Sequence, residues 1–86
     1  MKIFRELTKI KSSKSAVATL EATGSSIVGV WKITLSLSVD GRKVAEHNKS
    51  SFSNDWKVRL EHGDFIAYAQ RRVIPFEDAD LYFSLE

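Results

Sequence analysis

The residues best suited to a binding site lie between positions 57 and 72 of the 86-residue chain. Cationic and aromatic side chains alternate there with apolar ones, so two paired strands would carry them on one face. An aromatic ring between cations suits stacking on an unpaired base, with the cations at the phosphates, and it equally suits a protein interface. The candidate binding residues are Lys57, Arg59, Ile66, Tyr68, Arg71 and Arg72.

The two histidines are the side chains best placed by their ordinary pKa for acid–base chemistry near neutral pH. His47 falls on an expected edge strand and His62 at an expected turn. Nothing in their spacing brings them together. We therefore expect no catalytic residues, and a small basic nuclease that uses either histidine is a third interpretation.

Metal ligands are too few to predict a metal site. One expected turn carries Glu61, His62 and Asp64, and a second acidic group near the C-terminus contains Glu77, Asp78 and Asp80. A metal site needs about four to six ligands, and the acidic group lacks the glycine and distal glutamate of a calcium loop. There is no cysteine and no glycine-rich phosphate motif. We expect neither a metal nor a cofactor.

A hairpin near the middle of the chain is the strongest structural signal. Residues 33–39 alternate between large apolar and small polar side chains, which is typical of a strand with one buried face. Asp40-Gly41 predicts a two-residue turn, which places Leu37 opposite Val44 and Ser36 opposite Ala45. The returning strand, about 43–53, alternates weakly and reads as a polar edge strand.

A second hairpin carries the candidate binding residues. Residues 56–60 alternate, and a turn over 61–64 reverses the chain. A four-residue turn places Trp56 opposite Ala69 and Lys57 opposite Tyr68. Pro75 ends the second strand. The run 60–65 resembles the corner before the penultimate strand of many small β-sandwich modules, and this resemblance favours a sandwich over a barrel.

The remaining segments complete the domain. Ile3, Leu7 and Ile10 have helical spacing, which predicts a short N-terminal helix over 2–11. Residues 15–22 fit either a strand or an alanine-rich helix that Gly24 ends, and we adopt the strand. A last strand alternates over 81–85.

The charge is unevenly distributed along the chain. The net charge is +2, yet residues 1–14 carry +4 and residues 73–86 carry −4. Opposite ends can pair within one chain or between two chains, which argues against a surface committed to polyanions. The absence of cysteine fits a reducing compartment, and no apolar run is long enough to span a membrane. We expect a cytoplasmic protein without a membrane partner.

Together these patterns predict one mainly β domain over residues 1–86. It would contain five or six antiparallel strands, as a sandwich or small barrel, with a short N-terminal helix. The expected function is non-catalytic binding of a protein, or of a second copy in a homo-oligomer, as a binding module or small structural or inhibitory protein. Binding of RNA or single-stranded DNA through the basic and aromatic face is the alternative.

Overall fold

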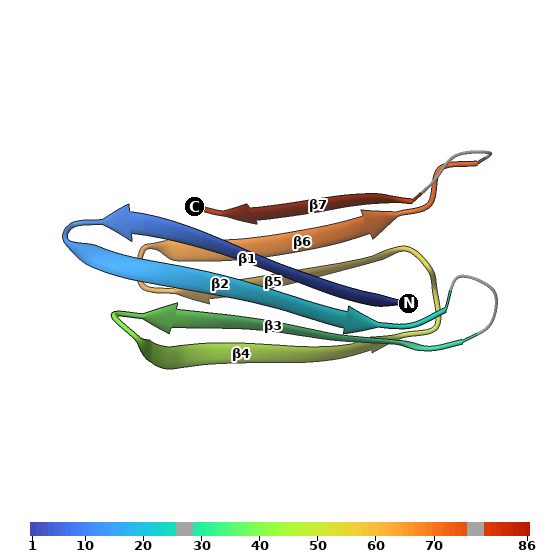
Figure 1. Cartoon of the computed structure of the whole chain (residues 1–86), viewed down its shortest axis with the longest axis horizontal. Helices are drawn as coiled ribbons and strands as arrows, with labels where there is room; N and C mark the ends of the chain where they lie inside the picture. The colour runs from blue at the N-terminus through green and yellow to red at the C-terminus, as the bar shows by residue number, and fades with distance from the viewer. Residues whose placement is uncertain (26–28, 76–78) are drawn as a thin grey trace.

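The computed structural model describes residues 1–25, 29–75 and 79–86, which form seven β-strands in two antiparallel sheets (Figure 1). The larger sheet has the order β1-β2-β3-β4 and the smaller sheet has the order β5-β6-β7. Each strand therefore pairs with its sequence neighbour, except where the chain crosses between the sheets after β4. The strands are β1 Lys2–Lys11, β2 Lys14–Thr23, β3 Trp31–Val39, β4 Arg42–Ser51, β5 Trp56–His62, β6 Phe65–Arg72 and β7 Asp80–Leu85.

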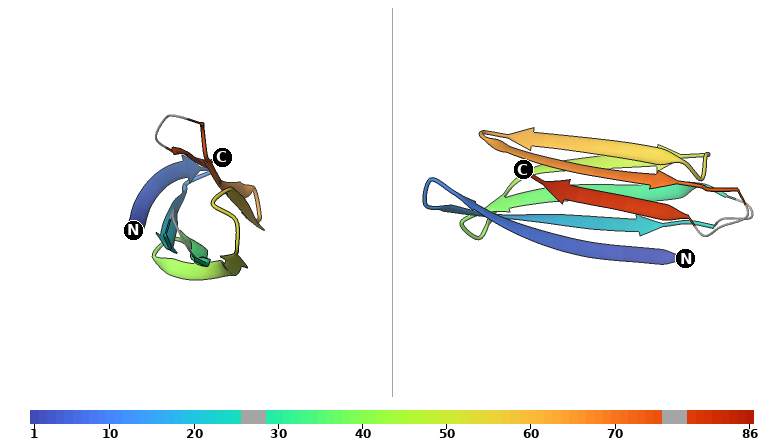
Figure 2. Two further views of the ribbon diagram at one scale, coloured as in Figure 1. Left: turned by 90° about the vertical axis from the view of Figure 1, so that its right-hand side faces the viewer. Right: turned by 90° about the horizontal axis from the view of Figure 1, so that it is seen from above.

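The hydrophobic core lies between the two sheets, which run along the long axis of a 44 × 21 × 16 Å molecule (Figure 2). Alternate residues of β2, β3, β5 and β6 point into it because successive side chains of a strand face opposite sides. Trp31 and Trp56 meet across the core with ring centroids 6.0 Å apart. Its largest fully buried side chains are Trp31, Leu20, Ile33, Leu35 and Leu37.

The predicted N-terminal helix is wrong, because residues 2–11 form the edge strand β1. No helix occurs in the described residues. Cross-strand partners share a face, so Arg5 opposite Leu20 and Lys9 opposite Ala16 lie on the core-facing side of β1. Basic residues thus alternate with the half-buried Ile3 and Leu7 on one face. Ile3 and Leu7 are therefore four positions apart, which is also the spacing of apolar residues on one face of a helix.

The strand interpretation of residues 15–22 is confirmed by β2. Its alanines share one face with Leu20 and are fully buried in the core. With β1 and β2 both present, the strand count is seven and not the predicted five or six.

The central hairpin is confirmed as β3 and β4, but its predicted register is wrong beyond the turn. Val39 pairs with Arg42, so the turn is the expected Asp40-Gly41. Both turn residues have positive φ, which glycine adopts at little cost. A β-bulge at Leu37/Ser38 then shifts the pairing, and Leu37 lies opposite Ala45 instead of Val44. β4 is an edge strand, as predicted.

The second hairpin is also confirmed, with its register displaced by two residues. His62 pairs with Phe65, so the turn is only Gly63-Asp64. Trp56 therefore lies opposite Arg71, and Tyr68 lies opposite Arg59 instead of Lys57. A shift of two residues keeps every side chain on its predicted face. The run 60–65 is a tight hairpin and not the corner that its sequence resembles.

Two lysines of the larger sheet donate hydrogen bonds to main-chain oxygens of the smaller sheet and its turn. Lys49 of β4 donates to the main-chain oxygen of Lys57 at 2.9 Å, and Lys11 of β1 donates to that of Asp64 at 2.9 Å. Lys11 also lies 5.7 Å from the centre of the Phe65 ring. In the described residues, no ion pair links 1–14 to 79–86, and no helix is long and apolar enough to cross a membrane.

Candidate binding face

The outer face of the smaller sheet carries five of the six predicted binding residues. The register places Lys57, Arg59, Ile66, Tyr68 and Arg72 on the side opposite the core, as predicted. Its other members are Glu61, Gln70, Asp80, Tyr82 and Ser84. We call this set of residues the tyrosine face.

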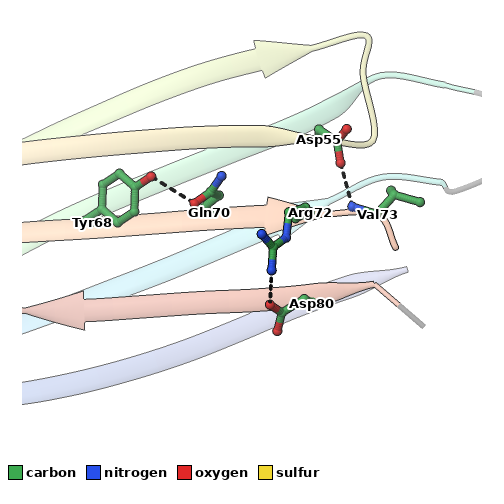
Figure 3. Close-up of polar contacts among 6 residues, drawn as sticks. All are labelled: Asp55, Tyr68, Gln70, Arg72, Val73 and Asp80. Carbon is green, nitrogen blue, oxygen red and sulfur yellow. Dashed lines mark hydrogen bonds and ion pairs between the residues drawn. The ribbon is translucent and has the colours of Figure 1, made fainter. Parts of the chain in front are cut away.

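Two tyrosines occupy the middle of the tyrosine face. Tyr68 of β6 and Tyr82 of β7 have ring centroids 6.0 Å apart at an interplanar angle of 57°. The Tyr68 hydroxyl donates to Gln70 Oε1 at 3.2 Å, which fixes the tip of its ring (Figure 3). Tyr82 is 54% exposed. The pair presents an aromatic surface that solvent reaches and that needs little ordering when a ligand binds.

Carboxylates accompany two of the cations on this face. Arg59 forms an ion pair with Glu61, and Arg72 Nη2 lies 3.5 Å from Asp80 Oδ2 (Figure 3). All four side chains are more than half exposed, so each pair contributes at most about 1 kcal/mol. The face therefore carries charges of both signs around its aromatic centre.

Arg71 does not belong to the tyrosine face, contrary to the prediction from sequence. It lies on the core side of β6 and is only 4% exposed. Its guanidinium covers the Trp31 ring and donates to the main-chain oxygen of Asn54 at 2.5 Å. Adjacent residues of a strand face opposite sides, so Arg71 and Arg72 cannot share one surface.

A hollow of about 450 Å³ adjoins the tyrosine face where β5 and β6 approach the connection between the sheets. Four cationic residues and one carboxylate contribute to its lining. Lys49 reaches it from β4, which sequence reasoning did not connect to this surface. The lining residues are Lys49, Asp55, Trp56, Lys57, Gln70, Arg71 and Arg72. We call this feature the basic hollow.

A second, smaller hollow of about 230 Å³ lies on the β7 side of the same face. Gln70, Arg72, Asp80 and Tyr82 line it, so Gln70 and Arg72 belong to both hollows. Asp55 Oδ1 accepts from the Val73 main-chain nitrogen at 2.6 Å, which ties the start of β5 to the end of β6 (Figure 3). The two hollows and the tyrosine pair form one continuous surface.

The sequence prediction omitted several residues of this surface, among them Gln70, Tyr82 and Lys49. Gln70 and Tyr82 alternate with core residues in their strands, so the period-two pattern would have placed them correctly once β7 was paired with β6. Lys49 comes from the other sheet, and a packing contact between sheets leaves no periodic signal in the sequence.

The histidines lie on separate parts of the molecule. His47 is exposed on β4, where it pairs with Leu35. His62 lines a hollow of about 150 Å³ beside the β5–β6 turn, and His47 does not. Next to His47, the pKa of Glu46 is lowered by the hydrogen bond and the charge of Lys43. Nothing here brings the two imidazoles into one site.

The other sequence candidates are also placed. In the described residues, no three or more acidic or histidine side chains cluster closely enough to hold a metal ion, Glu61, His62 and Asp64 included. Glu77 and Asp78 lie outside the described residues. On the outer face of the larger sheet, β3 carries Lys32, Thr34, Ser36 and Ser38, and Thr34 donates to Asn48 Oδ1 of β4 at 2.7 Å.

Comparison with known proteins gives no relative. The chain matches no family model, no curated protein and no solved structure.

Proposed function

We propose that this small, sandwich-like protein is a non-catalytic binding module that recognises a protein partner through the tyrosine face. The observation that carries the proposal is the ring contact between the half-buried Tyr68 and the exposed Tyr82 on the outer face of the smaller sheet. Tyrosine and arginine are enriched where protein interfaces concentrate their binding energy. Ile66 adds apolar area, and the charged groups form a polar rim.

The charges on the tyrosine face favour a protein over a nucleic acid. Nucleic-acid binding depends on cations that are free to neutralise phosphates. On this face Arg59 and Arg72 each have a carboxylate within ion-pair distance. A nucleic acid would have to approach Glu61 and Asp80 as closely as the arginines. A protein can place opposite charges against each of these groups.

The partner is a different protein or a second copy of this chain. To test the face itself, the tagged chain is used to capture partners from a lysate of the source cells treated with nuclease, with quantitative mass spectrometry as the readout. Tyr82→Ala is compared with Thr34→Ala, a matched truncation on the outer face of the larger sheet. Both residues lie on sheet exteriors, and circular dichroism checks that both variants fold.

The proposal requires a defined protein, or the chain itself, that Tyr82→Ala loses by at least about tenfold and Thr34→Ala retains. A loss of tenfold corresponds to about 1.4 kcal/mol, which is typical of an interface residue that matters. Two results would refute it. One is the same set of captured proteins with both variants. The other is the disappearance of every specific partner after nuclease treatment, which would indicate the nucleic-acid alternative.

A further inference from the structure

The lining of the basic hollow has a larger excess of positive charge than the whole chain. This lining contains Lys49, Lys57, Arg71 and Arg72 against the single carboxylate of Asp55, an excess of three positive charges. The whole chain carries only +2. Converging like charges repel one another, and a bound anion relieves that repulsion while gaining several charge-assisted hydrogen bonds.

Arg71 is buried and donates to Asn54, but the partners already present leave the other three cations able to bind an anion. Lys49 donates to a main-chain oxygen, which leaves its charge uncompensated. Lys57 has no ion pair with any residue that the structure describes. Arg72 and Asp80 are separated by 3.5 Å and both are more than half exposed, so the pair exchanges readily for a better one.

The lining of this hollow has two further features. Asp55 directs Oδ1 at the Val73 nitrogen, which engages the only carboxylate of the lining. Trp56 belongs to the same lining, and its buried indole N–H has no hydrogen-bond partner among the described residues. A volume of about 450 Å³ is within the range of ordinary ligand pockets.

We propose that the basic hollow receives an acidic segment of the protein partner, with a glutamate or aspartate side chain entering it. This inference rests on the proposed function and names the partner's chemistry. Gln70 and Arg72 line both hollows, and Tyr82 lines the smaller one. A segment anchored by a carboxylate in the basic hollow therefore extends over the tyrosine pair, whereas a free anion leaves that pair uncovered.

The test is a nuclear magnetic resonance titration of the whole ¹⁵N-labelled chain. The probes are a ten-residue peptide of alternating glutamate and tyrosine, the same peptide with glutamine for glutamate, inorganic phosphate and a ten-nucleotide thymidine strand. We expect saturable shifts of the Trp56 indole and of the amides of Lys57 and Gln70 with the acidic peptide. The glutamine peptide should bind at least about tenfold more weakly, because it lacks the charge.

Variants localise the binding to the hollow. Lys57→Gln and Arg72→Gln should each weaken the acidic peptide at least about fivefold, whereas Lys32→Gln, an exposed lysine of the larger sheet, should change it less than twofold. Equal weakening by all three variants would show that only net charge matters and would overturn the inference. So would saturable binding of phosphate without the peptide, tighter binding of the thymidine strand, or no binding at all. The Tyr82→Ala capture experiment is independent, so a protein partner lost there while the peptide fails leaves the proposed function standing.

Discussion

The guanidinium carbon of Arg71 lies 4.7 Å from the centre of the Trp31 ring, in the interior between the two sheets. Both side chains also hold Asn54, since Trp31 Nε1 donates to its side-chain oxygen at 2.9 Å and Arg71 donates to its main-chain oxygen. Asn54 belongs to the connection that crosses from β4 to β5. The sheets are therefore joined at this point by a cation, an indole and one loop residue.

This arrangement predicts that substitutions of the two neighbouring arginines have very unequal effects on stability. Arg71→Ala should lower the free energy of unfolding by about 2–4 kcal/mol, since it removes the cation–π contact and leaves a carbonyl without its donor. Arg72→Ala, on the exposed side, should change it by less than about 0.5 kcal/mol. Urea denaturation measures both values. Similar losses in the two variants would contradict the burial of Arg71.

Gly24 lies so close to Trp31 that any side chain would collide with the ring. A Cβ atom built at this position overlaps three atoms of the indole. Gly24→Ala should therefore cost about 1–3 kcal/mol, as overpacking of a rigid core does. Gly41→Ala is the matched control, since its Cβ meets nothing and only its positive φ of 82° is penalised, at about 1 kcal/mol. A Gly24 variant as stable as the Gly41 variant would rule out the close packing.

The failure to predict β1 from sequence has a specific physical cause. An edge strand is half covered, so its core-facing side tolerates cations such as Arg5 and Lys9 between apolar residues. Its turn, Ser12-Ser13, also lacks the glycine or asparagine that marks most two-residue hairpins. The central strand β3 has neither ambiguity, and it was accordingly predicted from its alternation alone.

The sequence predicted which residues lie on the outer face of the smaller sheet, but not which of them are neighbours in space. Alternation assigned Lys57, Arg59 and Tyr68 to the exterior correctly, because a register error of two residues leaves each side chain on the same face of the sheet. The same rule excludes Arg71, which composition alone had included. The basic hollow depends on Lys49 from the other sheet, and no local pattern reports how two sheets are placed against each other.

The Ser12-Ser13 turn offers a direct stabilising change. Both serines have positive φ, at 49° and 64°, a conformation that costs an ordinary residue about 1 kcal/mol. Ser13→Gly should raise the free energy of unfolding by about 0.5–1 kcal/mol, because glycine adopts this conformation without strain. Ser15→Gly, within β2, should lower it. Thermal and urea unfolding of both variants test the prediction, and a destabilised Ser13→Gly chain would contradict the turn geometry.

The edge strand β4 predicts a charge-controlled association. Lys49 lies opposite Ile33 on the core-facing side, and inward-pointing charges discourage edge strands from pairing with another chain. Lys49→Val should therefore increase dimerisation at about 100 μM, as measured by analytical ultracentrifugation at low and high salt. A dimer formed through β4 should resist salt, whereas one formed through the oppositely charged chain ends should weaken as salt rises. A Lys49→Val chain that sediments as the parent chain does would remove β4 from consideration.

Glu46 provides a test by pH. Lys43 lowers its pKa by a hydrogen bond at 2.9 Å and by its charge. A lowered folded-state pKa adds stability that is present above the unfolded value and lost as the pH falls through the folded one. Lys43→Gln should raise the pKa of Glu46 toward its ordinary value in a carboxylate titration followed by nuclear magnetic resonance. An unchanged pKa in that variant would show that the pair does not form in solution.

Among the described residues, three two-residue turns lie at one end of the molecule, and the connection over 52–55 lies at the other (Figure 1). One extra residue at Ser12-Ser13, Asp40-Gly41 or Gly63-Asp64 would shift the register of the following strand by one. Its core side chains would then point to the outer face. The lengths of these three turns thus decide which side of each following strand faces the core.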